Sequence, residues 1–71
     1  MITNLDFSEN LKMLRKKSNL TQSDIADFLQ ISRQSVSKWE MGISLPSLIF
    51  LEPLSEILNC SIEELLCINN S

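Results

Sequence analysis

The stretch from residue 21 to residue 40 constrains the fold of this 71-residue chain more than any other. Thr21 and Ser32 are good helix N-caps, because their side-chain oxygens can accept from the unpaired N–H groups of a first helical turn. Apolar residues follow each cap at helical spacing. The pattern predicts two short helices over residues 22–29 and 33–40, joined by a tight turn.

Each of these two helices has a predicted inner face. Ile25 and Leu29 stand four residues apart in the first helix, and Ala26 is small enough to let the two helices approach closely. Val36 and Trp39 share one face of the second helix. The opposite face of the second helix carries an outward polar row that consists of Arg33, Gln34, Ser37 and Lys38.

Helical patterns also precede and follow this stretch. Phe7, Leu11 and Leu14 recur at helical spacing and predict a helix over residues 7–17, with Asp6 as its N-cap. Near the end of the chain, a capping box and the apolar residues after it predict a short helix over residues 62–66, and this signal consists of Ser61, Glu64, Ile62, Leu65 and Leu66.

The segment between them is apolar-rich and contains Pro46 and Pro53. A helix over residues 48–58 that began from a Ser47 cap would place Pro53 at its sixth position, where the missing N–H costs about 3 kcal/mol. A regular helix that begins nearer Phe50 leaves this proline in the tolerant first turn. We expect a fourth helix with an irregular entry, and both starting points stay open. The predicted fold is an all-α, compact five-helix bundle in a single domain over residues 1–71.

The charge distribution is uneven. The net charge of −3 argues against a polyanionic partner. All six basic residues nevertheless lie between positions 12 and 38, together with two acidic residues, so this window carries +4. Residues 41–71 contain four glutamates and no base. Such an asymmetry orients a protein on a polyanion, and both helices of the central stretch lie inside the basic window.

Several classes of function lack support. The chain has no His and no Tyr, and its single Gly excludes a phosphate-cradling loop, so we expect neither an enzyme nor a cofactor. Cys60 and Cys67 are too few for a zinc site, and we expect reduced, largely buried thiols in a cytoplasmic protein without a metal. No stretch approaches the ~20 apolar residues of a membrane span. No small-molecule site is evident.

The central stretch resembles the helix-turn-helix of the Xre family, the lambda-repressor-like and Cro-like regulators. The matching residues are Gln22, Ile25, Ala26, Leu29, Ile31, Ser32, Gln34, Val36, Trp39, Glu40 and Gly42. The resemblance covers about residues 9–66, and it implies a lambda-repressor-like bundle in a regulator that binds double-stranded DNA. Many family members have Gly where this chain has Gln30, and a positive φ at Gln30 would cost about 1–2 kcal/mol. Met41 and Ile43 also depart from the family pattern.

The outward polar row would then enter the major groove. Gln34 is the best candidate for a base contact, because glutamine pairs bidentately with adenine. Arg33 and Lys38 can reach guanine or a phosphate, and Ser37 is short enough for a close approach. The candidate phosphate contacts are Gln22, Ser32, Ser35 and Lys17. In Xre relatives an Arg late in the first helix pairs with the Glu that ends the recognition helix, so the resemblance implies a structural salt bridge between Arg15 and Glu40.

One such domain offers few DNA contacts, and helix-turn-helix proteins commonly dimerise on half-sites about 34 Å apart. We expect a symmetric homodimer through the fourth and fifth helices that represses from a palindromic operator. The candidate interface consists of Ile43, Leu45, Ile49, Phe50, Leu54, Cys67 and Ile68. Two alternatives stay open. The chain could be a DNA-binding antitoxin that also binds a toxin protein, or a protein-interaction module that has lost DNA binding. A toxin or an antirepressor stays open as a partner protein.

Overall fold

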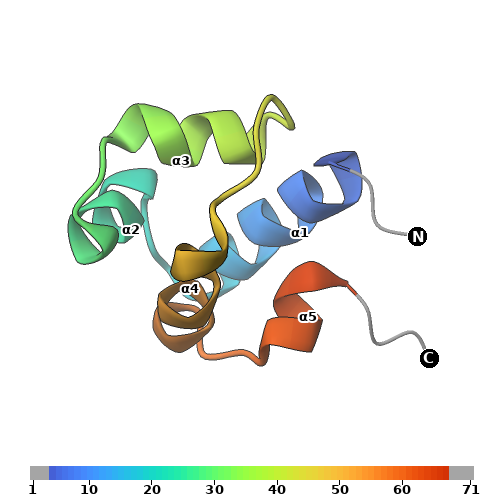
Figure 1. Cartoon of the computed structure of the whole chain (residues 1–71). Helices are drawn as coiled ribbons and strands as arrows, with labels where there is room; N and C mark the ends of the chain where they lie inside the picture. Colours follow the sequence, from blue (N-terminus) through green and yellow to red (C-terminus); the bar gives the residue numbers. More distant parts are fainter. Residues whose placement is uncertain (1–3, 68–71) are drawn as a thin grey trace.

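The computed structural model describes residues 4–67, which form a helical bundle (Figure 1). Its elements are α1 (Asn4–Lys17), α2 (Gln22–Leu29), α3 (Arg33–Glu40), the 3-10 helix η1 (Leu48–Phe50), α4 (Leu51–Ile57) and α5 (Ile62–Leu66). Helix α3 packs against α1 and α2 on one side of the bundle, and α4 and α5 close the other side. The all-α prediction is confirmed: the described residues contain no strand. None of their helices combines the length and the apolar character that crossing a membrane requires.

The core draws on all five α-helices and excludes water from their inner faces. Ile25 and Val36 are completely buried where α2 meets α3, and Ala26 is buried beside them, as expected of a small residue at a close crossing. The full set of buried apolar residues is Phe7, Leu11, Ile25, Ala26, Leu29, Val36, Trp39, Leu54, Leu58 and Leu65.

Three of the helix starts have the predicted side-chain caps. The Thr21 hydroxyl accepts from the Asp24 backbone N–H at 3.0 Å, and the Asp24 carboxylate accepts from the Thr21 N–H at 2.8 Å. These bonds to Thr21, above all the backbone one, lower the pKa of Asp24, because they favour its charged form. Ser61 forms the same reciprocal box at α5, and the Ser32 hydroxyl caps α3. The entry into α2 and α3 is therefore fixed by local hydrogen bonds.

The start of α1 differs from the prediction. The helix begins at Asn4, so Asp6 lies in its first turn and is not the N-cap. The expected start was placed at the first residue of the apolar stripe, but nothing in the two residues before Asp6 breaks a helix, and the helix continues through them. A carboxylate in the first turn is still favourably placed in the helix dipole.

The entry into α4 is irregular, as expected. Ser47 makes no side-chain cap, and the chain passes through the 3-10 turn Leu48–Phe50 before α4 begins at Leu51. Pro53 therefore lies in the first turn of α4, where its missing N–H would have had no helical acceptor. Of the two starting points left open, the one nearer Phe50 is correct for the regular helix.

All five α-helices are followed by a residue with positive φ. At four of these ends the next N–H donates back to a carbonyl five residues earlier, as Ile31 does to Ala26 at 3.0 Å. Gly42 is the only glycine among them, and Gln30 adopts the left-handed conformation that the sequence comparison with Xre proteins implied. The complete set is Asn19, Gln30, Gly42, Asn59 and Cys67.

Leu54 offers a test of the packing. Because its side chain is completely buried, Leu54→Ala should lower the free energy of unfolding by about 2–5 kcal/mol through lost burial and the cavity left behind. Met13→Ala is the matched control, since Met13 is 53% exposed and its truncation should change stability by less than about 0.5 kcal/mol. Urea denaturation followed by circular dichroism measures both, and equal losses for the two variants would contradict this core.

Candidate nucleic-acid interface

The outer face of α3 is polar and accessible. Arg33, Gln34 and Lys38 are exposed, whereas Val36 and Trp39 turn inward and hold the helix on the core. Ser37 is half-buried, so its side chain projects less far from the surface than those of the other three residues. Three of the four predicted base-contact residues thus project from the surface, and the fourth lies between them.

The two serines near the start of α3 are engaged in its own cap. The Ser32 hydroxyl accepts from the Ser35 backbone N–H at 3.2 Å, and the two hydroxyl oxygens are 3.1 Å apart. Capping therefore accounts for Ser32, while the exposed position of both bonds still leaves room for a phosphate oxygen.

An ion pair joins the end of α3 to α1. Arg15 Nε donates to Glu40 Oε2 at 2.6 Å and Nη2 donates to Oε1 at 3.0 Å, which is the bidentate arrangement of a guanidinium and a carboxylate. The Glu40 side chain is 1% exposed, and the hydrogen bond from Arg15 to it raises the pKa of that guanidinium above its usual value. Arg15 also donates to the Leu20 carbonyl at 2.9 Å. The pair implied by the Xre resemblance is present, and it connects α1, the α1–α2 connection and α3.

Gln22 links this pair to the start of α3. Its Nε2 donates to Glu40 Oε1 at 3.1 Å, and its Oε1 accepts from Arg33 Nη1 at 3.1 Å. Both ends of the amide are thus used inside the protein. The NH₂ group of Gln22 keeps a second N–H, so the expected donation to a phosphate stays a prediction. Its backbone N–H, in the first turn of α2, remains oriented outward along the helix axis.

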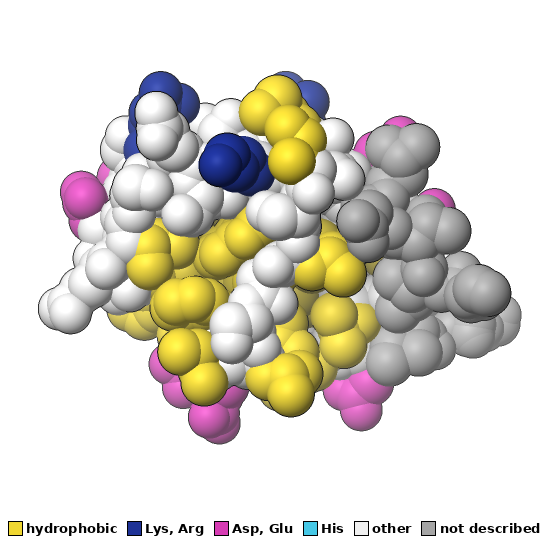
Figure 2. Space-filling view, turned by 45° about the horizontal axis from the view of Figure 1, so that its top comes forward, with side chains coloured by type: hydrophobic (Ala, Val, Ile, Leu, Met, Phe, Trp, Pro, Cys, Tyr) yellow, Lys and Arg dark blue, Asp and Glu magenta, His cyan; other side chains and the backbone are white. Residues whose placement is uncertain are grey.

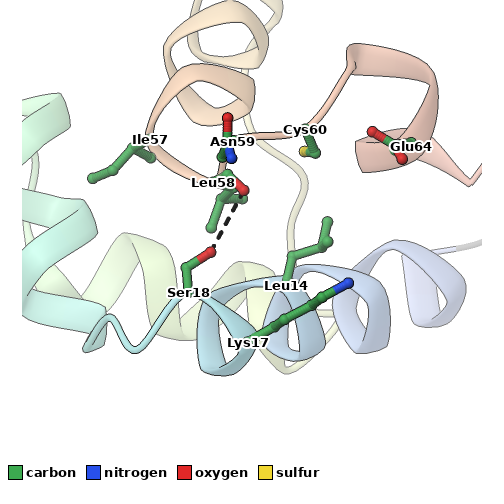
Figure 3. Close-up of a pocket in the computed structure, with 8 residues that line it drawn as sticks. All are labelled: Leu14, Lys17, Ser18, Ile57, Leu58, Asn59, Cys60 and Glu64. Carbon is green, nitrogen blue, oxygen red and sulfur yellow. Dashed lines mark hydrogen bonds between the residues drawn. The ribbon is translucent and has the colours of Figure 1, made fainter.

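Lys17 lies apart from the α3 row. It lines a cleft of about 530 Å³ between α1 and the connection from α4 to α5 (Figure 3). Ser18 Oγ donates to the Leu58 carbonyl across the cleft at 3.5 Å. The lining consists of Leu14, Lys17, Ser18, Ile57, Leu58, Asn59, Cys60 and Glu64, and it includes no residue of α3. A phosphate contact from Lys17 therefore stays a prediction.

The cysteines do not form a reactive or metal-binding group. Both are free thiols, and partial desolvation, helped by a nearby carboxylate in each case, raises the pKa of Cys60 and of Cys67, so both are protonated at neutral pH. Cys67 is exposed, contrary to expectation, because it is the left-handed residue that ends α5. Among residues 4–67 no group of three or more metal-ligating side chains occurs.

An apolar patch lies below the basic side chains on the same face of the molecule (Figure 2). The exposed large apolar residues of the segment between α3 and α4 and of η1 are Met41, Ile43, Leu45, Leu48 and Ile49, whose residues are 58%, 62%, 53%, 83% and 73% exposed. Acidic side chains appear at the lower edge of this view and also at its left edge and upper right, whereas the basic side chains gather at the top. The asymmetry of charge along the chain is therefore also an asymmetry in space.

One member of the predicted dimer interface needs correction, and a second is only partly accessible. Leu54 is completely buried in the core, so its side chain cannot reach a partner. Phe50 is half-buried, because its ring packs against Trp39 with 5.8 Å between ring centroids. Ile68 lies outside the described residues. Leu48, which the prediction omitted from the interface, is the most exposed large apolar residue in the patch.

The hydrogen bonds of Gln22 and the exposure of Leu48 were the features that sequence reasoning missed. Gln22 is 11 residues from Arg33 and 18 from Glu40, so no helical period connects them. Leu48 lies in a 3-10 turn, where the i, i+4 rule for inner faces does not apply. The only feature of the sequence that pointed to a contact of Gln22 was the charged residue Glu40 at the end of α3.

Comparison with known proteins finds similar sequences in proteins that are named as transcriptional regulators. A family model described as Helix-turn-helix matches residues 11–65. The HTH-type transcriptional activator BcrR of Enterococcus faecalis is 40% identical over 62 residues, which are 87% of this chain and 30% of that protein. The chain spans 30–56% of the length of the first curated relatives that it matches.

Solved structures agree with the family match. The P22 c2 repressor in complex with a synthetic operator has a TM-score of 0.80 at 28% identity, over 89% of this chain and 96% of that one. The restriction-modification controller protein C.AhdI from Aeromonas hydrophila has a TM-score of 0.80 at 27% identity, over 87% of this chain and 94% of that one.

The ion pair between α1 and α3 can be tested by removing one charge. Arg15→Met should lower the free energy of unfolding by about 3–5 kcal/mol, because it leaves the buried Glu40 carboxylate without a counter-charge. Denaturation in urea, followed by far-UV circular dichroism, measures the loss. The double variant Arg15→Met/Glu40→Gln removes both charges and should recover part of it. A single variant as stable as the wild type would show that the pair does not hold α3.

Proposed function

This chain belongs to the helix-turn-helix family, so we propose that it is a transcriptional regulator that binds double-stranded DNA with α3 in the major groove. The observation that carries the proposal is the exposed polar row of α3 above an inner face held by Val36 and Trp39. The P22 c2 repressor, which has the same fold, was solved on a synthetic operator. Repression is the proposed mode of action, because a bound bundle occludes the DNA that it covers.

Base readout is assigned to the middle of this row. Gln34 is exposed, and its amide can donate to N7 and accept from N6 of adenine in a bidentate pair. Lys38 lies one helical turn further on the same side and can reach guanine or a phosphate. Ser37 contributes by permitting the helix to approach the groove floor.

Phosphate contacts are assigned to the flanks of the row. Ser32 and Ser35 lie at the start of α3, where the helix dipole favours an anion. Gln22 contributes through its backbone N–H and through the second N–H of its NH₂ group, since only one of the two donates to Glu40. The basic side chains gather on the upper part of this face, and this grouping favours one orientation on the duplex (Figure 2). A chromosomal target would place the protein in the cytoplasm.

Selection from a random duplex library tests DNA recognition directly. We expect a defined sequence to be enriched, and Gln34→Ala to relax the preference at one base step in each half-site, at about 1–3 kcal/mol of discrimination. Ser23→Ala, at an exposed position of α2, is the control and should leave the preference unchanged. Affinity should fall as salt is raised, because phosphate contacts release counterions. Weak binding that does not respond to salt would instead favour a protein-interaction module.

The apolar patch is the proposed dimer interface. Ile43, Leu45, Leu48 and Ile49 are too exposed to serve the core of this chain, and a contiguous apolar surface of this kind is typical of a protein contact. Leu45 and Leu48 also line an apolar pocket of about 220 Å³ into which a partner side chain can insert. A symmetric dimer through this patch would present two α3 helices to the two halves of a palindrome.

Sedimentation equilibrium tests the dimer. Ile49→Glu should shift the protein toward monomer at tens of micromolar, because it would place a charge in an apolar contact next to its own copy across the two-fold axis. Met13→Glu, on the exposed side of α1, is the matched control and should leave the association unchanged. A wild-type protein that is monomeric throughout would remove the homodimer. A stable complex with a second small protein would then favour the antitoxin alternative.

A further inference from the structure

The side chain of Asn10 joins α1 to the last turn of α5. Its Nδ2 donates to the carbonyl of Glu64 at 2.7 Å and to the carbonyl of Leu65 at 2.8 Å, one bond for each hydrogen of the amide. Carbonyls in the last turn of a helix lack the i+4 donors of its interior, so α1 supplies donors that α5 itself cannot. The Cys67 thiol adds a longer contact from the end of α5 to the Asp6 carbonyl, at 3.8 Å.

These two bonds matter because α5 is short. A helix of five residues is not stable on its own in water, so α5 stays helical only while it is docked on the bundle. The completely buried side chain of Leu65 anchors α5 on the core, but apolar contact is largely non-directional. Bonds from one side chain to two consecutive carbonyls are directional, and they define the rotation of α5 about its own axis.

The rotation of α5 decides where the next residue, Leu66, points. Leu66 is half-buried and forms one wall of the apolar pocket of about 220 Å³ that shares two residues with the apolar patch. The residues that line this pocket are Phe7, Leu45, Pro46, Leu48, Leu51 and Leu66. A rotated or detached α5 would open the wall, so the shape of the pocket depends on the bonds from Asn10.

We infer that Asn10 is a positioning residue of the proposed dimer interface, an inference that rests on the proposed function. Asn10 is half-buried and donates both of its hydrogens within the chain, so it acts through α5 and not through a contact of its own with the second copy. It holds Leu66 so that the pocket is already formed when an apolar side chain of the second copy enters. A preformed pocket loses less free energy to ordering on association than one that must form on contact.

Replacement of Asn10 by aspartate tests the inference. Asn10→Asp keeps the size of the side chain but sets a carboxylate against two carbonyl oxygens and the negative end of the α5 dipole. The dissociation constant of the dimer, measured by sedimentation equilibrium, should rise by at least about tenfold. Asn59→Asp makes the same change of charge at an exposed position after α4 and is the matched control, so its dissociation constant should change by less than about twofold.

A second variant and a core control separate positioning from general destabilisation. Asn10→Ala removes both donors without adding a charge, so it tests the inference even where Asn10→Asp does not fold, and it should raise the dissociation constant about threefold. Ile25→Val removes a buried methyl group from α2, which contributes nothing to the pocket, and should leave the constant unchanged. Circular dichroism identifies the variants that are folded at the working temperature. A folded Asn10 variant with the wild-type constant would overturn the inference, and so would an equal loss in Asn59→Asp.

A measurement on the monomer separates this inference from the proposed dimer. In the Ile49→Glu background, which we expect to be monomeric, the methyl groups of Leu48 and Leu66 should show a nuclear Overhauser effect across the pocket that they both line. Adding Asn10→Asp should remove this effect, and an unchanged effect would overturn the positioning role. A wild type that is monomeric throughout, with the effect lost on adding Asn10→Asp, would instead count against the proposed dimer.

Discussion

The bidentate ion pair between Arg15 and Glu40 is the interaction on which the presentation of α3 depends. An eight-residue helix is not stable alone in water, so α3 exists only because its inner face is packed. Hydrophobic contacts such as those of Val36 and Trp39 are largely non-directional. A guanidinium fork on a carboxylate is directional, and it defines the rotation of α3 about its own axis. The polar row faces outward because of both effects together.

A buried ion pair is weak evidence of net stability, since desolvation of both charges offsets much of their attraction. In this protein the ion pair between Arg15 and Glu40 acts mainly by fixing the orientation of α3. Glu40 has three hydrogen bonds, from Arg15 twice and from Gln22, so its carboxylate has little freedom to move. The same contacts neutralise a negative charge at the end of the helix that is proposed to approach phosphates. The contacts of Glu40 with Arg15 and Gln22 thus both orient α3 and reduce the repulsion between α3 and a phosphate backbone.

Local signals made most of the fold predictable from the sequence. The caps at Thr21, Ser32 and Ser61 act within three residues, and they located the starts of α2, α3 and α5 correctly. The beginning of α1 was not predictable in this way, because no residue before Asp6 stops the helix. Leu54 was assigned to an interface because the chain has more apolar residues than one small core was expected to hold, and the core in fact includes this one.

The candidate site was predictable only in part, for a related reason. Arg33, Gln34 and Lys38 could be assigned to the outside of α3 from the positions of Val36 and Trp39 in the same helix. The contacts of Gln22 could not be predicted from the sequence, because they depend on how α2 and α3 cross. The Arg15–Glu40 pair was predicted from the Xre resemblance, because the spacing of residues along the chain does not indicate it.

The left-handed helix ends have a consequence for the lifetime of the protein. Gln30 and Cys67 hold positive φ values that cost residues with a Cβ about 1–2 kcal/mol each, relative to glycine. A chain of this size has little stability in reserve, so these two positions increase the fraction of molecules that are open to proteases at any moment. These backbone angles therefore lower the resistance of the fold to proteolysis.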